Sequence, residues 1–120
     1  MTMRILVIDD DDGVRVTLEH MLRSWGCEVT SADSSRQGLE LAKKLQPELI
    51  MTDLIMPDNA GAEIIVSLKR TCPNVRVVAM SGGARLGNAN ILREAKENGA
   101  DYILPKPFER DQLRAALGLT

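Results

Sequence analysis

The chain has little of several features that mark particular classes of protein. Its 120 residues include two cysteines, Cys27 and Cys72, and one residue each of Phe, Tyr and Trp. The two cysteines are far apart and form no CxxC pair, so we expect buried reduced thiols rather than a metal or redox site. So few aromatic residues also argue against a carrier that stacks a flavin ring on its side chains.

Long apolar runs and an excess of one charge are missing as well. No apolar run approaches the roughly 20 residues needed to span a bilayer, and the first residues do not resemble a signal peptide. With 15 Lys and Arg against 17 Asp and Glu, the net charge of -2 gives no electrostatic reason to expect a nucleic acid or membrane partner. We therefore expect a cytoplasmic protein, and its length suits one domain with one sizeable core.

Segments typical of strands alternate with segments typical of helices. Short apolar runs at 5–8, 48–51 and 75–80 have the composition of strands that are buried on both faces. Weaker strand candidates lie at 27–32 and 100–104. The segments between them have apolar residues at helical spacing. This alternation predicts βαβ units, and hence a parallel sheet with helices on both faces.

Local signals predict where the first two helices begin and end. Asp11 and Asp12 are expected to cap the first helix and to favour its dipole, and Gly26 is expected to end it. Ser34 or Ser35 is expected to cap the second helix. The residues expected to face the core in the five helices are Val14, Leu18, Met21, Leu22, Trp25, Leu39, Ala42, Leu45, Ile64, Ile65, Leu68, Ile91, Leu92, Ala95, Leu113, Ala116 and Leu117.

Polar residues follow four of the expected strands. Asp9 and Asp10 follow the first strand, Asp53 the third, Ser81 the fourth and Lys106 the fifth. The carboxyl ends of parallel strands meet at one edge of an open sheet, and ligands bind there. We therefore expect carboxylates, a hydroxyl and an ammonium group to converge at this edge.

These residues lie in sequence motifs that resemble the receiver domain of bacterial two-component response regulators. The motifs are VIDD at 7–10, TDLIMP at 52–57, AMSGG at 79–83 and GADYILPKPF at 99–108. The resemblance implies one receiver domain over residues 1–120. The implied fold is a flavodoxin-like, three-layer α/β fold with a five-stranded parallel sheet of order 2-1-3-4-5. Independently, Pro105 just after the fifth strand predicts that this strand lies at an edge.

The resemblance implies a phosphoryl-transfer site. Asp53 matches the aspartate that accepts a phosphoryl group from a sensor histidine kinase or a phosphotransfer protein. Asp9 and Asp10 match the acidic pair that holds a divalent cation, with Asp10 as the direct ligand and Asp9 acting partly through water. Mg²⁺ suits such a site because it prefers oxygen ligands and keeps several waters. The backbone carbonyl of Ile55 is another implied ligand.

The resemblance also assigns the residues that surround the phosphoryl group. Lys106 matches the lysine that pairs with its oxygens, and Ser81 matches the hydroxyl residue that turns toward it. A cis peptide bond is implied before Pro107. Where the family often has an aromatic switch residue this chain has Ile103, and Tyr102 should point to the opposite side. We therefore expect the switch to act through repacking of the segment after Ser81.

Two further expectations concern the lifetime of the phosphoryl group and the output of the signal. Ile55 and Gly83 stand where the family often modulates hydrolysis, and neither side chain can position a water molecule, so we expect a long-lived phosphoryl group. The output domain is either covalently linked or separate, and homodimerisation on phosphorylation is an open alternative. We expect no direct nucleic-acid or membrane contact by this domain.

Other functional classes fit the sequence less well. A nucleotide-binding enzyme needs a glycine fingerprint, but Asn88 stands where a P-loop has its lysine and no GxGxxG follows the first strand. A haloacid-dehalogenase-like phosphatase normally has a second carboxylate where Ile55 stands. The remaining rival is a receiver-like interaction domain that works without phosphorylation.

Overall fold

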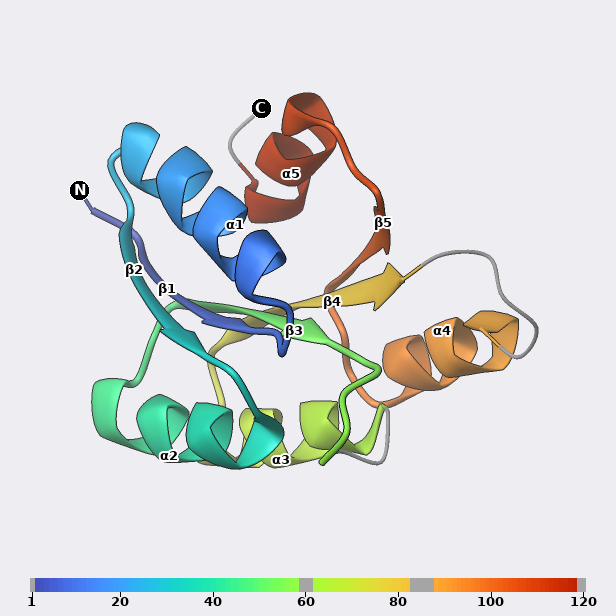
Figure 1. The fold of residues 1–120 in the computed structure, drawn as a ribbon. Coiled ribbons are helices and arrows are strands. Elements are labelled where there is room, and N and C mark those ends of the chain that lie inside the picture. The colour runs from blue at the N-terminus through green and yellow to red at the C-terminus, as the bar shows by residue number, and fades with distance from the viewer. Residues whose placement is uncertain (1, 59–61, 83–87, 119–120) are drawn as a thin grey trace.

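Strands and helices alternate strictly along the chain. The computed structural model describes residues 2–58, 62–82 and 88–118, with the backbone alone for 88–90. The elements are β1 (Arg4–Ile8), α1 (Asp12–Ser24), β2 (Glu28–Ala32), α2 (Ser35–Leu45), β3 (Leu49–Asp53), α3 (Glu63–Thr71), β4 (Arg76–Gly82), α4 (Asn88–Glu97), β5 (Tyr102–Lys106) and α5 (Arg110–Leu117). The strands form one parallel sheet of order β2-β1-β3-β4-β5 (Figure 1), which confirms the flavodoxin-like fold.

Three strands extend further toward their carboxyl ends than the sequence predicted. β3 ends at Asp53, β4 at Gly82 and β5 at Lys106. Asp53, Ser81 and Lys106 are therefore strand residues rather than loop residues. Pro105 lies within β5, opposite Ser81 in the register, although we expected it just after the strand. A proline is tolerated near the end of the outermost strand because few ladder hydrogen bonds depend on its missing N–H.

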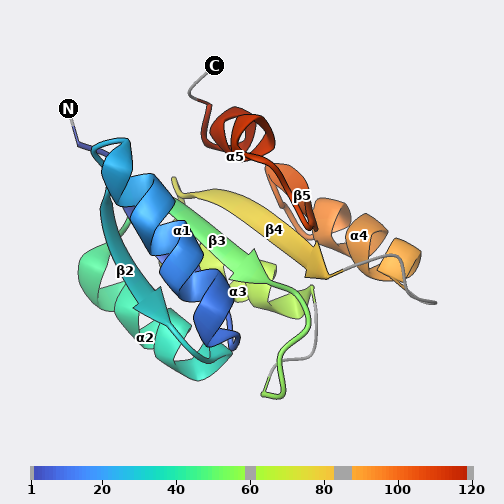
Figure 2. The same cartoon turned by 45° about the horizontal axis from the view of Figure 1, so that its top comes forward.

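Helices cover both faces of the sheet. α1 and α5 lie side by side on one face, and α2, α3 and α4 cover the other (Figures 1 and 2). The buried residues accordingly form two clusters. The first cluster lies between the sheet and α2, α3 and α4, and includes Leu6 and Ile8 of β1. The second lies between the sheet and α1 and α5, and includes Ile5 and Val7.

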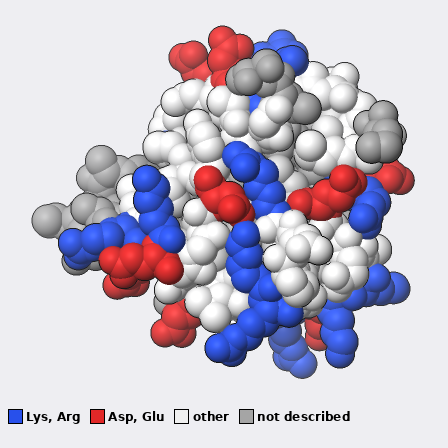
Figure 3. Space-filling view, turned by 180° about the vertical axis from the view of Figure 1, so that it is seen from behind, with Lys and Arg blue, Asp and Glu red and all other residues white. Residues whose placement is uncertain are grey.

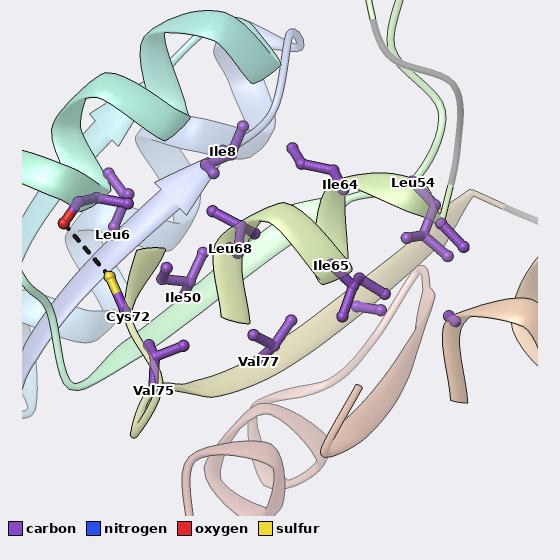
Figure 4. Packing of buried hydrophobic residues seen from close by; sticks show 14 of the residues in the cluster. Leu6, Ile8, Ile50, Leu54, Ile64, Ile65, Leu68, Cys72, Val75 and Val77 are labelled. Atoms are coloured by element: carbon purple, nitrogen blue, oxygen red, sulfur yellow. Dashed lines mark hydrogen bonds between the residues drawn. The ribbon is translucent and has the colours of Figure 1, made fainter. Parts of the chain in front are cut away.

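The first cluster is built from α3 and the central strands. Ile65 and Leu68 of α3 are fully buried against the strands that carry Ile50 and Val77 (Figure 4). Most helix residues expected to face the core do so. Leu45 is an exception, because it is 38% exposed at the C-terminal end of α2.

Both cysteines are free and buried, as the sequence predicted. Cys27 belongs to the second cluster, and the Cys72 thiol donates to the carbonyl of Ala42 over 3.4 Å (Figure 4). Burial raises the pKa of both thiols. Both residues therefore act as core residues.

The predicted helix signals are confirmed at α1 and α2. The Asp11 carboxylate accepts a hydrogen bond from the Val14 N–H over 3.1 Å and caps α1. Gly26 follows the end of this helix with a φ of 87°, a conformation that glycine adopts without strain. Ser34 caps α2. None of the helices in the described ranges has the length and apolar character needed to cross a membrane.

Lysine and arginine side chains gather on the face seen from behind, over the region of α2 and α3 (Figure 3). The last turns of these helices carry Lys43 and Lys44, and Lys69 and Arg70. Cations are stabilised at a helix C-terminus by the helix dipole. These four cations therefore lie where the dipoles of α2 and α3 stabilise positive charge.

Candidate functional site

Three carboxylates meet at the carboxyl edge of the sheet. One carboxylate oxygen from each of Asp9, Asp10 and Asp53 lies within 4.8 Å of the others. They meet because β1 and β3 are neighbours, with Ile8 opposite Thr52 in the register. Asp9 and Asp53 are 0% and 6% exposed, whereas Asp10 faces solvent. The structure thus brings together three of the predicted site residues.

Lys106 supplies the positive charge of this cluster. Its Nζ donates to Asp9 Oδ2 over 2.6 Å and to Asp53 Oδ2 over 3.1 Å. Its ammonium group therefore reaches from the outermost strand to the ends of β3 and β1. The peptide bond between Lys106 and Pro107 is cis, as predicted.

Burial and charge shift the pKa values of two groups in the cluster. Burial raises the pKa of Asp53, although the N–H of Ile55 donates to this carboxylate over 3.1 Å and Lys106 attracts it. Burial alone would lower the pKa of Lys106, but the hydrogen bond to Asp9 and the charges of Asp53 and Asp9 outweigh burial and raise it. The ammonium group therefore stays charged beside a poorly solvated carboxylate. Buried groups with shifted pKa values are typical of functional sites.

The donor set fits a divalent cation such as Mg²⁺. All three acidic residues offer carboxylate oxygens, which are the ligands that this ion prefers. Counted as three carboxylates and one ammonium group, the cluster with Lys106 has a formal charge of -2, which favours a cation. The Asp10 carboxylate gives an ion access from solvent.

Ser81 and the residues of the expected switch lie on β4 and β5. Ser81 is 3% exposed, and the register places Asp53 opposite Met80, the residue before it. Ile103 packs against the first cluster and Tyr102 against the second, so these neighbours point to opposite faces as expected. Residues 83–87, which include Gly83 and the loop part of the segment expected to repack, lie outside the described residues.

Arg15 belongs to the site but was missed in the sequence. Its guanidinium donates to the backbone carbonyl of Asp9 over 2.7 Å and pairs with the carboxylate of Asp12. Its spacing of three residues from Asp12 on a helix is the signal that predicts this pair. The four consecutive aspartates therefore have different roles. Asp9 and Asp10 line the site, Asp11 caps α1 and Asp12 pairs with Arg15.

Asp58 was also missed, although it lies only five residues after Asp53. Its carboxylate accepts hydrogen bonds from the N–H groups of Ser35 and Arg36 on α2. These partners are 23 and 22 residues away in the sequence. No local pattern connects residues so far apart.

Comparison with known proteins finds a match over nearly the whole chain. The family model of the response regulator receiver domain matches residues 5–118. The chain is 32% identical over 117 residues to the sporulation initiation phosphotransferase F of Bacillus subtilis, with 98% of this chain and 92% of that protein covered. It is 31% identical over 115 residues to the cell cycle transcriptional regulator CtrA of Caulobacter vibrioides. That match covers 96% of this chain but only about half, 48%, of the regulator.

Solved structures of similar proteins have the same architecture. A response regulator receiver domain protein from Clostridium thermocellum superposes with a TM-score of 0.88 at 29% identity, covering 97% of this chain and 91% of that chain. A response regulator protein from Burkholderia pseudomallei has a TM-score of 0.86 at 30% identity, covering 96% and 66%. The Burkholderia structure contains a phosphorylated aspartic acid, a calcium ion and citrate.

Proposed function

Because the chain belongs to the response regulator receiver domain family, a family of signalling domains, we propose that Asp53 accepts a phosphoryl group in a Mg²⁺-dependent reaction. The proposed donor is a phosphohistidine on a sensor histidine kinase or a phosphotransfer protein. The observation that carries the proposal is the ammonium group of Lys106, which bridges Asp9 and Asp53 beside Asp10. The phosphorylated aspartic acid and the calcium ion of the Burkholderia protein support the same reading.

In the proposed reaction a carboxylate oxygen of Asp53 attacks the phosphorus of the donor. A P–O bond forms while the P–N bond of the phosphohistidine breaks, and the imidazole nitrogen keeps the electron pair and takes up a proton. Phosphoryl transfer needs mainly positioning and charge neutralisation. Burial leaves the attacking carboxylate poorly solvated. Lys106 then donates to the phosphoryl oxygens, and the hydroxyl of Ser81 adds a hydrogen bond.

Four groups of this chain are proposed to hold the metal ion. They are the carboxylates of Asp9, Asp10 and Asp53 and the backbone carbonyl of Ile55. The Asp9 carboxylate already accepts hydrogen bonds from the Asp11 N–H over 2.9 Å and from Lys106, so exposed Asp10 is the better direct ligand. When bound, the ion neutralises charge on the phosphoryl oxygens.

The proposed signal passes from this domain to an output domain, which is either linked to it or separate. We propose that residues 1–120 form one receiver domain. Dimerisation on phosphorylation is an alternative route for the signal. Because Ile103, which is partly buried against the first cluster, stands where the family often has an aromatic residue, the conformational change is proposed to run through the segment after Ser81. Unchanged amide exchange over residues 82–98 on phosphorylation would contradict this route.

The experiment that tests the proposed function is intact mass spectrometry after incubation with acetyl phosphate. The wild type should gain one phosphoryl group with Mg²⁺ and none with a chelator. Asp53→Asn should gain none. Asp111→Asn on α5 is the matched control, because it removes an exposed carboxylate that is not part of the acidic cluster, and it should be labelled like the wild type. An unlabelled wild type, under conditions that label a known receiver, would leave the rival reading of a phosphorylation-independent interaction domain.

A further inference from the structure

One carboxylate ties the loop after β3 to the N-terminus of α2. Asp58 Oδ1 accepts from the N–H of Ser35 over 3.0 Å, and Oδ2 accepts from the N–H of Arg36 over 3.2 Å. These are first-turn N–H groups, which have no partner within a helix. The hydroxyl of Ser34, the helix's own cap, accepts from the N–H of a different residue, Gln37. Both carboxylate oxygens of Asp58 are thus engaged by α2.

The same loop has further anchors between Asp53 and this clamp. The N–H of Leu54 donates to the carbonyl of Met80 over 3.1 Å, and the Leu54 side chain is 1% exposed. The N–H of Ile55 donates to Asp53, and the Met56 side chain is 5% exposed. The position of the Ile55 carbonyl is therefore fixed by anchors on both sides of it.

α2 is itself held against the strand that leads into the acidic pair. A Cβ on Gly38 would lie 2.4 Å from the Ile8 side chain, so the helix lies closer to β1 than any residue with a Cβ would allow without a shift. Ile8 directly precedes Asp9. The clamp thus connects the loop that follows Asp53 and carries Ile55 to a helix that is closely packed against β1.

We propose that Asp58 is a positioning residue for the divalent cation, because it clamps the loop after β3 to α2 and so holds the Asp53 carboxylate and the Ile55 carbonyl at the spacing that the ion needs. The proposal rests on the metal site of the proposed function. Partners that orient metal ligands without touching the ion typically affect its affinity by an order of magnitude or more. Without the clamp, ordering the loop would cost binding free energy each time an ion binds.

The test is the dissociation constant for Mg²⁺, measured by isothermal titration calorimetry without any phosphodonor. We compare the wild type, Asp58→Ala and Asp58→Asn. Glu63→Ala is the matched control, since Glu63 is exposed at the start of α3 and its side chain makes no hydrogen bond or ion pair within the described part of the chain. Amide exchange of Ser35 and Arg36 reports separately whether the clamp is lost.

The variants are expected to bind Mg²⁺ more weakly than the wild type in a defined order. Asp58→Ala should raise the dissociation constant about tenfold, with faster exchange of the Ser35 and Arg36 amides. Asp58→Asn keeps one acceptor oxygen, so its dissociation constant should lie between those of Asp58→Ala and the wild type. If the alanine variant does not fold, Asp58→Asn is compared with Glu63→Ala instead. Glu63→Ala should stay within about twofold of the wild type, because an exposed charge contributes little.

Equal Mg²⁺ affinities of Asp58→Ala and Glu63→Ala would overturn the proposal. Unchanged amide exchange in Asp58→Ala would also overturn it, because no clamp would then have existed. The two proposals fail differently. If the wild type binds Mg²⁺ with the expected order of variants but is not labelled by acetyl phosphate, the phosphotransfer proposal fails and the clamp stands. If Asp53 is labelled while all variants bind Mg²⁺ equally, the clamp alone fails.

Discussion

Replacing Gly38 with alanine is expected to destabilise the fold, although alanine favours helices over glycine. A Cβ at this position would lie 2.4 Å from Cδ1, 2.8 Å from Cγ1 and 3.1 Å from Cγ2 of Ile8. Ile8 is 0% exposed, and close-packed interiors offer a displaced side chain little room. Overpacking of this kind costs about 1 to 3 kcal/mol, while helix propensity returns at most about 1 kcal/mol. The free energy of unfolding should therefore fall by about 1 kcal/mol.

Urea denaturation followed by circular dichroism measures this loss. A second background, Ile8→Val, isolates the cause because valine lacks the Cδ1 atom that lies nearest to the added methyl group. Ile8→Val alone should cost about 0.5 to 1.5 kcal/mol, but Gly38→Ala should then cost less than it does in the wild type. Two outcomes would refute the reasoning. One is a Gly38→Ala protein at least as stable as the wild type, and the other is the same cost in both backgrounds.

Three further predictions concern charges and thiols. Lys106→Met leaves the buried Asp9 carboxylate without its ammonium partner, so in a chelator the free energy of unfolding should fall by about 3 kcal/mol; an unchanged urea midpoint would contradict this. Burial alone would raise the pKa of Asp101, but its hydrogen bonds, chiefly the one from Lys69, outweigh burial and lower this pKa. The ionised Asp101 therefore stabilises the fold above the unfolded pKa of about 4, and this stabilisation is lost as the pH falls through the folded pKa. When the pH falls from about 5 to about 3, Asp101→Asn should lose less of its free energy of unfolding than the wild type does. The two buried cysteines should react with a thiol reagent only after unfolding, so rapid labelling of the native protein would contradict their burial.

The fold was predictable because the strands are short apolar runs. ILVI at 5–8 is typical of a central strand with helices on both faces, and its residues alternate between the two buried clusters. The carboxyl ends of the strands were less predictable. Lys106 and Pro105 do not look like strand residues, and only their pairing with β4 makes them so.

The site residues that the ends of the strands bring together were predictable from the sequence. The contacts that depend on how the helices pack on the sheet were not. Asp9, Asp10 and Asp53 follow or end neighbouring strands, so the topology alone brings their carboxylates together. The roles of Arg15 and Asp58 depend on how α1 and α2 pack on the sheet. Arg15 contacts the backbone carbonyl of Asp9, and Asp58 contacts backbone N–H groups of α2; backbone partners have no sequence signature, unlike the pair of Arg15 with Asp12.

The two clusters of buried residues lie on opposite faces of the same sheet. Successive residues of β1 belong to alternate clusters, and Tyr102 and Ile103 do the same on β5. Neither cluster can lose its strands without exposing the apolar surface of the other. The two halves of the molecule should therefore melt together in one cooperative transition, as small single domains commonly do. The acidic site at the ends of these strands should keep its geometry until the entire sheet comes apart.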